Sequence, residues 1–133
     1  MPPVINHPPS FPLLNVLVGD DEAGRLFCNA AEIEAMLRVE AALAGAEADL
    51  GLIENEAAQR IADVCRDLSV DWDSLAAGLA RDGVVVPDLV RQLRAAVGER
   101  YAQAVHLGAT SQDIVDTGLA LRLKDLAALL LDR

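Results

Sequence analysis

The chain has 133 residues, a net charge of −10 at pH 7, and a composition that is 53% hydrophobic but only 3% aromatic. Its apolar residues are mainly Ala and Leu, which favour helices, whereas strands would require Val, Ile, Tyr and Phe. We therefore expect an all-α protein. The acidic charge argues against binding to nucleic acid or an anionic membrane, because both require a basic face. It does not exclude an anionic substrate, since a local site can oppose the overall charge.

Cysteine usage and the N-terminal composition indicate an intracellular protein. Cys28 and Cys65 are expected to be free thiols, and no spacing of Cys and His resembles a metal site. The N-terminus lacks the basic start and apolar stretch of a signal peptide, and nowhere do about 18 uninterrupted apolar residues occur. We expect a cytoplasmic protein with no membrane span and no metal.

The first residues of the chain are expected to be largely irregular. Residues 1–12 are rich in proline, which does not fit the interior of a helix, and should form an extended arm. A short helix is expected over 13–17, followed by a turn at 19–21, where one Gly and two Asp residues favour chain reversal.

A long helix should follow the turn. Asn29 is a plausible N-cap with Glu32 three residues later, and Gly51 is a plausible C-terminal stop. Apolar residues spaced by three and four predict one buried stripe, comprising Met36, Val39, Leu43, Ala46, Leu50 and Ile53. The opposite, solvent-facing side should carry Glu34, Arg38, Glu47 and Asp49.

Four shorter helices are expected next. Two are predicted over 54–68 and 71–83, and another should begin at Pro87, which suits the first turn of a helix. A fourth short helix is expected over 99–105. The β-branched run 84–86 is too short for a useful strand and is interpreted as a buried connector.

The last segment is apolar on nearly every face. Thr110 and Asp113 have the spacing of a capping box, and the helix that follows is dominated by leucine through Leu131. Such a helix must be buried on all sides, yet the chain has little material left to cover it. We therefore expect this helix to continue in a longer parent protein or to pack against other subunits.

Residues 106–113 gather hydrogen-bonding groups at this helix entry. Thr110, Ser111 and Gln112 offer side-chain donors, while the first-turn N–H groups and the helix dipole favour negative charge. His106 precedes them and Gly108 leaves room for a ligand. Together they could seat a carboxylate or phosphate. From spacing alone, however, an ordinary N-cap at Thr110 and a half-buried structural His106 remain somewhat more plausible.

The segment His106-Leu-Gly-Ala-Thr-Ser-Gln-Asp-Ile-Val-Asp-Thr117 resembles the first signature region of the fumarase/aspartase superfamily. Its best match there is the 3-carboxy-cis,cis-muconate cycloisomerase family, whose version reads His-Trp-Gly-Ala-Thr-Ser-Gln-Asp. Residues 35–44 and 47–53 are also similar to that family's N-terminal helix. Two departures are Leu107 in place of Trp, and Gly-Val-Val-Val-Pro-Asp at 83–88 in place of Gly-Asn-Pro-Val-Ile-Pro-Leu.

The resemblance implies an N-terminal helical domain over 13–109 and the truncated start of a long central-bundle helix over 110–133. It implies a homotetramer in which each active site combines three sequence regions from three subunits, without a metal or cofactor. The site residues would bind a small polycarboxylate: Thr110 and Ser111 would hydrogen-bond a carboxylate, His106 would position or polarise the substrate, and Gln112 and Asp113 would shape the pocket.

The resemblance further implies that the catalytic groups are encoded elsewhere. The superfamily's second-region His and its mobile Gly-Ser-Ser loop have no counterpart in these 133 residues. The chain alone is therefore expected to contain no catalytic residue and to be inactive, because proton transfer needs those groups within hydrogen-bond reach.

For the parent protein, the implied reaction is cycloisomerisation of 3-carboxy-cis,cis-muconate to a carboxymuconolactone in aromatic-compound catabolism, on the β-ketoadipate pathway. Two alternatives stay open. The chain could be a non-catalytic oligomerisation module that uses its apolar last helix. It could also belong to an adenylosuccinate-lyase-like enzyme, whose family carries a Thr-Ser-x-Asp version of the signature.

Overall fold

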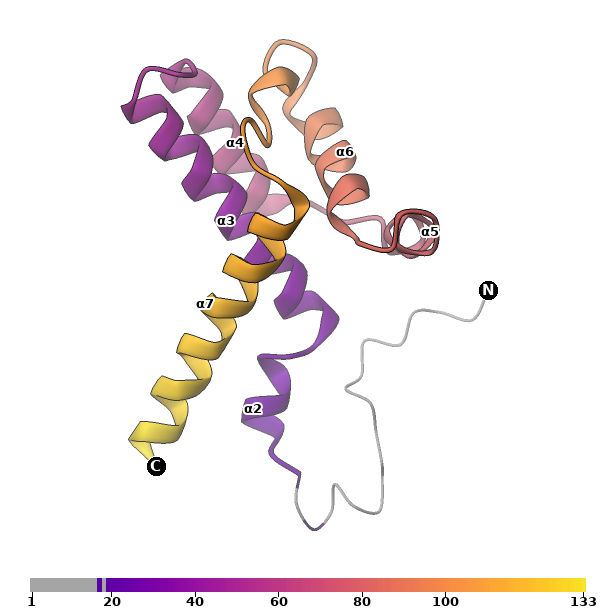
Figure 1. The fold of residues 1–133 in the computed structure, drawn as a ribbon, viewed down its shortest axis with the longest axis vertical. Helices are drawn as coiled ribbons and strands as arrows, with labels where there is room; N and C mark the ends of the chain where they lie inside the picture. The colour runs from indigo at the N-terminus through magenta and orange to yellow at the C-terminus, as the bar shows by residue number, and fades with distance from the viewer. Residues whose placement is uncertain (1–16, 18) are drawn as a thin grey trace.

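A computed structural model describes Leu17 and residues 19–133, and every regular element in this part of the chain is helical (Figure 1). This confirms the expected all-α class. The arm over 1–12 and nearly all of the helix expected over 13–17 lie outside the described residues. The elements are α2 (Asp21–Arg25), α3 (Asn29–Asp49), α4 (Asn55–Asp67), α5 (Trp72–Asp82), α6 (Val86–Val97), the 3₁₀ turn η1 (Ala102–Ala104) and α7 (Ser111–Asp132). Among the helices described, none has the length and apolar character needed to cross a bilayer.

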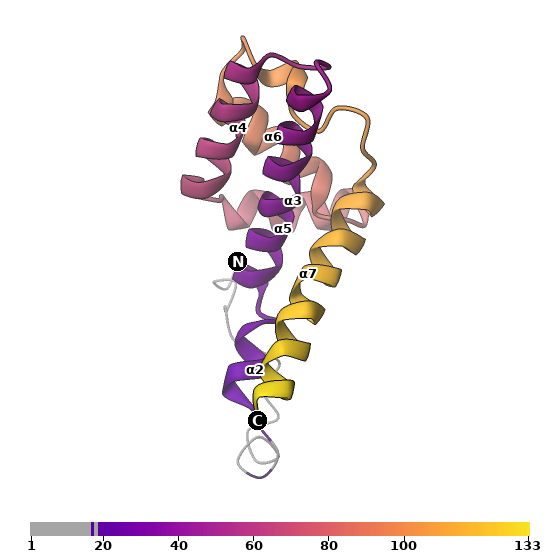
Figure 2. The same cartoon turned by 90° about the vertical axis from the view of Figure 1, so that its left-hand side faces the viewer.

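Helix α3 is the centre of the fold and packs most extensively against α4 on one side and α7 on the other. Figure 2 shows α7 running alongside α3 and continuing past it beside α2. The core between the helices consists of aliphatic side chains, including the fully buried Met36, Ile61, Leu89, Leu93 and Ile114. Burial of such side chains is the main favourable contribution to folding. The core thereby fixes the start of α7, because Ile114 lies in its first turn.

The buried face of α3 differs from the predicted stripe. Leu50, expected inside, is 75% exposed, whereas Glu47, expected on the solvent side, is only 6% exposed. The inward face instead comprises Ile33, Ala35, Met36, Leu37, Glu40, Ala44 and Glu47. The prediction was wrong because alanine is common on every side of this helix. Contacts with α4 and α7, rather than apolar spacing alone, decide which face is buried.

Two local predictions near the start of the chain, a helix start at Asn29 and a turn at 19–21, were also wrong. Cys28 is the N-cap of α3 and makes no side-chain capping bond, so Asn29 is the first helical residue. The expected turn at 19–21 is the beginning of α2, because the Asp20 carboxylate accepts a hydrogen bond of 3.0 Å from the backbone N–H of Ala23. Asp20 thus acts as an N-cap rather than as a turn residue.

The predicted helices over 54–68 and 71–83 are confirmed as α4 and α5. Helix α6 begins at Val86, one residue before Pro87, so Val86 belongs to the helix rather than to the connector. The helix expected over 99–105 is reduced to η1, because Gly98 has a φ of +93° and residues 99–101 form a turn. The chain therefore enters residues 105–110 as a loop.

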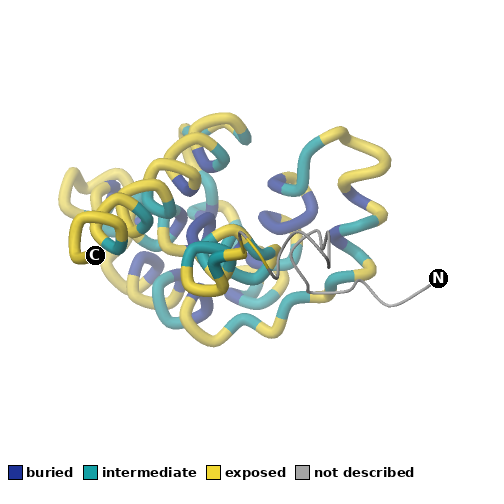
Figure 3. The backbone as a smooth tube through the Cα atoms, turned by 90° about the horizontal axis from the view of Figure 1, so that it is seen from below, coloured by how far each residue is buried: buried dark blue, intermediate teal, exposed yellow. Residues whose placement is uncertain are grey.

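Much of α7 is not covered by the described residues. Its fully buried positions are Ile114 and Gly118, both near its start. Figure 3 shows the C-terminal part of this helix exposed, and Leu123, Leu130 and Leu131 are 47%, 54% and 88% exposed. At its end, Arg133 pairs with Asp20 and lies 2.7 Å from Glu22, joining α7 to the start of α2. As expected, the described residues leave the later part of α7 exposed.

Candidate functional site

The entry of α7 is held by a reciprocal capping box. The Thr110 hydroxyl accepts from the backbone N–H of Asp113 at 3.3 Å, and the Asp113 carboxylate accepts from the backbone N–H of Thr110 at 2.8 Å. The same carboxylate oxygen accepts from the Thr110 hydroxyl at 2.7 Å. The capping box predicted from the spacing of these two residues is therefore confirmed.

Some hydrogen-bond donors at the start of α7 already bond to other protein groups, and others remain available to a ligand. The Thr110 hydroxyl hydrogen is directed to Asp113, and the Gln112 amide donates to Asp116 at 2.6 Å. The hydrogen bonds found among residues 19–133 include none from the Ser111 hydroxyl or from the first-turn N–H groups of Ser111 and Gln112. Helix first turns leave such N–H groups without intrahelical partners. The donors available to a ligand at this entry are therefore those of Ser111 and the Gln112 backbone.

Asp113 carries its own negative charge at the helix entry. Hydrogen bonds from the Thr110 backbone and hydroxyl lower the pKa of Asp113, and the charge of His106 lowers it further. The carboxylate is exposed, and it interacts favourably with the N-terminal end of the helix dipole. An anion bound here would have Asp113 as a like-charged neighbour, so its partners must be the donors that Asp113 does not already use.

His106 lies on the loop before α7 and reaches back to α3. Its Nδ1 is 2.6 Å from Oε1 of Glu40, and the Glu40 side chain is only 1% exposed. The backbone of His106 has a φ of +60°, in the left-handed region that is unusual for a residue with a Cβ. Arg94 fixes the preceding residue by donating to the Val105 carbonyl at 3.0 Å. The loop is therefore held in a specific conformation that places the imidazole against Glu40.

Sequence reasoning missed Glu40. It lies four residues after Met36 and four before Ala44, both of which are buried on the inward face of α3. A single acidic residue at such a core-facing position could have been noticed. Its partner His106 is 66 residues away in the chain, and only the fold brings the two together.

A second buried carboxylate lies two helical turns along α3. Glu47 is 6% exposed, and one carboxylate oxygen each of Glu40 and Glu47 has no hydrogen-bond partner among the described residues. Burial raises the pKa of Glu40, although His106 and Arg94 partly offset this effect. Burial and the nearby Glu40 likewise raise the pKa of Glu47. This region of α3 therefore disfavours additional negative charge.

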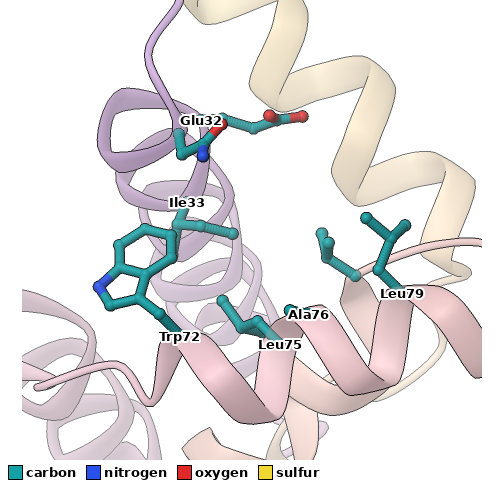
Figure 4. A pocket seen from close by; sticks show the side chains of 8 residues that line it. Glu32, Ile33, Trp72, Leu75, Ala76 and Leu79 are labelled. Carbon is teal, nitrogen blue, oxygen red and sulfur yellow. The ribbon is translucent and has the colours of Figure 1, made fainter. Parts of the chain in front are cut away.

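Two hollows lie near these elements. One, of about 480 Å³, is lined by residues of the 51–57 and 100–107 segments, including Arg100, Tyr101 and Leu107. The other, of about 160 Å³, lies between α3 and α5 and is mainly apolar, with Ile33, Trp72, Leu75 and Leu79 in its wall and Glu32 beside them (Figure 4). Leu107, which replaces the Trp of the resembled signature, thus lines the first hollow. Within the described range, no three His, Cys, Asp or Glu residues are grouped to hold a metal.

Comparison with known protein families identifies the family to which this chain belongs. The sequence model of a family described as "Lyase" matches residues 21–133, which includes all the described helices. The chain belongs to this lyase family, part of the fumarase/aspartase superfamily. The family assignment agrees with the resemblance carried by residues 106–117.

Individual relatives differ in their named reactions. The chain is 46% identical over 95 residues to the N-acetyl-S-(2-succino)cysteine lyase of Enterococcus italicus, covering 71% of this chain and 21% of that protein. It is 40% identical over 103 residues to the 3-carboxy-cis,cis-muconate cycloisomerase of Pseudomonas putida, covering 75% and 24%. It is 33% identical over 115 residues to the adenylosuccinate lyase of Methanocaldococcus jannaschii, covering 86% and 25%.

The fold agrees with a solved member of the family. The crystal structure of β-carboxy-cis,cis-muconate cycloisomerase from Acinetobacter calcoaceticus sp. ADP1 superposes with a TM-score of 0.85 at 34% identity. The match covers 90% of this chain and 29% of that one. The chain spans about a fifth to a quarter of the length of the three curated relatives.

Proposed function

We propose that this chain supplies the N-terminal, substrate-carboxylate-binding region of a lyase-family enzyme that acts on a small polycarboxylate. The observation that carries this proposal is the entry of α7, where residues 106–113 form a capped helix start whose Ser111 donors and Gln112 backbone N–H have no partner among the described residues. Such a helix start suits an anion through its N–H groups and its dipole. Residues 13–109 would be the N-terminal domain and residues 110–133 the start of the central helix bundle.

The signature residues would have different roles. Ser111 would donate its hydroxyl and N–H to a substrate carboxylate, with the Gln112 N–H beside it. Thr110 and Asp113 would maintain the helix entry, because their polar groups already bond to one another. The Gln112 side chain, held by Asp116, would form part of the pocket wall. His106 would contribute a ring nitrogen to substrate positioning.

For the complete protein we propose cycloisomerisation of 3-carboxy-cis,cis-muconate, in which one carboxylate adds across a double bond. Negative charge then develops on another carboxyl group, and preorganised donors stabilise such charge in a transition state. The acid and base would come from regions outside these 133 residues, in a cytoplasmic homotetramer without a cofactor. The apolar outer face of α7 is consistent with such an assembly.

A second candidate reaction is cleavage of a 2-succino thioether. It is favoured by the 46% identity to N-acetyl-S-(2-succino)cysteine lyase and by Leu107, which departs from the signature of the cycloisomerase family. Adenylosuccinate is a third candidate substrate, supported by the more distant relative. In all three proposals α7 would have the same carboxylate-binding role, so they differ in substrate rather than in the function of this region.

The test is to assay the gene product that carries this chain on 3-carboxy-cis,cis-muconate, N-acetyl-S-(2-succino)cysteine and adenylosuccinate. Turnover of one of them is expected, and Ser111→Ala should lower its kcat/KM by about 10²-fold, the usual effect of removing one preorganised donor. Thr110→Ser, which keeps the capping hydroxyl, should remain close to wild type. Absence of turnover on all three substrates, or full activity of Ser111→Ala, would overturn the proposal. A monodisperse oligomer without activity would instead favour the non-catalytic module.

A further inference from the structure

The pairing of Glu40 with His106 has a chemical consequence for the ring. His106 has two nitrogens, and Nδ1 is occupied by the contact of 2.6 Å with the Glu40 carboxyl group. Among the hydrogen bonds of residues 19–133, none involves Nε2. A carboxyl group bonded to one ring nitrogen fixes the ring orientation and determines what the other nitrogen presents.

The surroundings disfavour net negative charge on this pair. Glu40 is 2% exposed and one of its oxygens has no partner, while Glu47 on the same helix is also buried with an unpartnered oxygen. Burial raises the pKa of the Cys65 thiol of α4, and the charge of Glu40 raises it further. Arg94 of α6 is the nearby cation, and Asp113 of α7 interacts with the ring side of the pair. A buried carboxylate beside a neutral imidazole would be offset only by the charge of Arg94, which donates its hydrogen bond to the Val105 carbonyl rather than to Glu40, and such burial is costly.

The alternative is a pair that holds one more proton and has no net charge. That proton lies between Oε1 of Glu40 and Nδ1 of His106. If it is on the imidazole, the ring is an imidazolium with hydrogens on both nitrogens. If it is on the carboxyl group, the neutral ring accepts at Nδ1 and keeps its hydrogen on Nε2. In both arrangements Nε2 is a hydrogen-bond donor.

We propose that Glu40 is a positioning residue that holds His106 through Nδ1 and keeps Nε2 protonated, so that the ring presents a donor to a carboxylate bound at the entry of α7. The proposal deepens the carboxylate-binding function suggested above and depends on it for the identity of the ligand. The loop geometry supports it. Buried Val105, the Arg94 contact and the left-handed backbone at His106 together hold the ring against Glu40. If Nε2 carried no hydrogen, a carboxylate bound at the entry of α7 would instead face the lone pair of that nitrogen.

The test uses nuclear magnetic resonance of the 133-residue chain labelled with ¹⁵N-histidine at pH 7, without any ligand. The His106 signals are assigned by their loss in His106→Gln, which leaves the signals of His7. The wild-type chain should show a protonated Nε2 and an Nδ1 signal shifted by the proton shared with Glu40. In Glu40→Met the ring loses its Nδ1 partner, so both nitrogens should show averaged signals of two exchanging tautomers, with Nε2 protonated in only part of the population. Glu40→Gln, whose amide can donate to Nδ1, should retain an ordered ring with protonated Nε2.

Glu34→Gln is the matched control, because it removes an exposed carboxylate of α3 that lies off the inward face. Its His106 signals should match those of the wild type. A bare Nε2 in the wild-type chain, or an Nδ1 signal unchanged in Glu40→Met, would overturn the proposal. The wild-type spectrum is decisive even if Glu40→Met does not fold. Because no ligand is used, this outcome is independent of whether the gene product turns over any of the three substrates.

Discussion

Gly78 of α5 lies directly against Asp88 of α6, so closely that a Cβ added to Gly78 would lie 2.6 Å from the Cβ of Asp88. Asp88 is buried, and its carboxylate accepts from the Ser74 hydroxyl at 3.1 Å, from Arg91 at 2.8 Å and from the Gln92 amide at 2.8 Å. Burial raises the pKa of Asp88, but these hydrogen bonds outweigh it and leave the pKa below its usual value. The contact thus joins α5 to α6 through a satisfied buried charge.

Gly78→Ala should therefore destabilise the protein. The added methyl group would push α5 away from Asp88 and weaken its hydrogen bonds, with an expected loss of about 1–3 kcal/mol, as for other overpacked sites. Urea unfolding followed by circular dichroism measures the change. The matched control is Gly45→Ala in α3, where nothing lies within 4 Å of the added Cβ. That variant should gain about 0.5–1 kcal/mol, because alanine is favoured over glycine inside helices. Equal effects of the two substitutions would contradict the packing argument.

At the entry of α7, loss of the Thr110 hydroxyl should lower stability, whereas loss of the Ser111 hydroxyl, which we assign to ligand binding, should not. Thr110→Ala removes the capping hydroxyl and should lower the free energy of unfolding by about 1 kcal/mol. Ser111→Ala should leave stability within about 0.5 kcal/mol, since the Ser111 hydroxyl has no bond among the described residues and such surface changes have small effects. Urea unfolding of both variants checks this difference. A larger loss of stability in Ser111→Ala than in Thr110→Ala would show that Ser111, rather than Thr110, stabilises the start of the helix.

The sequence was informative where local rules decide structure. The Thr110–Asp113 capping box, the left-handed Gly83 that ends α5, and the all-helical class all follow from nearby residues and composition. The position of the site entry along the chain therefore follows from the amino-acid sequence alone. The family signature strengthened that prediction because it covers the same residues.

The face of α3 that enters the core could not be predicted in the same way. Alanine is buried at Ala35 and Ala44 but exposed at Ala46, so apolar spacing does not define a single stripe. Glu40 on the inward face is paired with His106, which lies 66 residues away. Pairings of this kind arise from tertiary packing, and the residue pattern of a single helix does not contain them.

Glu47 should be a source of pH-dependent instability. Burial and the neighbouring Glu40 raise its pKa in the folded state, so the folded protein binds a proton more tightly than the unfolded chain does. Stability should consequently fall as pH rises from the unfolded pKa, about 4.3, through the higher folded value. Glu47→Met removes a buried carboxylate whose oxygen lacks a partner and should raise the free energy of unfolding at pH 7 by about 1 kcal/mol. Urea unfolding at pH 4 and pH 7 should show a smaller pH dependence in this variant. An unchanged dependence would mean that Glu47 is solvated in solution.

Asp113 should have the opposite pH dependence. Hydrogen bonds from the Thr110 backbone and hydroxyl lower its pKa in the folded protein, below the value of about 3.9 in an unfolded chain. The ionised cap therefore stabilises the fold above that pH, and the contribution is lost as pH falls through the folded pKa. Asp113→Asn should be less stable than the wild type at pH 7, and the difference should shrink as both are measured nearer pH 3. Thr110→Ala removes the hydroxyl that donates to Asp113 but keeps the backbone N–H, so the same substitution made in a Thr110→Ala background should have a smaller effect at pH 7 without losing it entirely. A full effect in that background would show that the Thr110 hydroxyl does not contribute to the stability of the ionised cap.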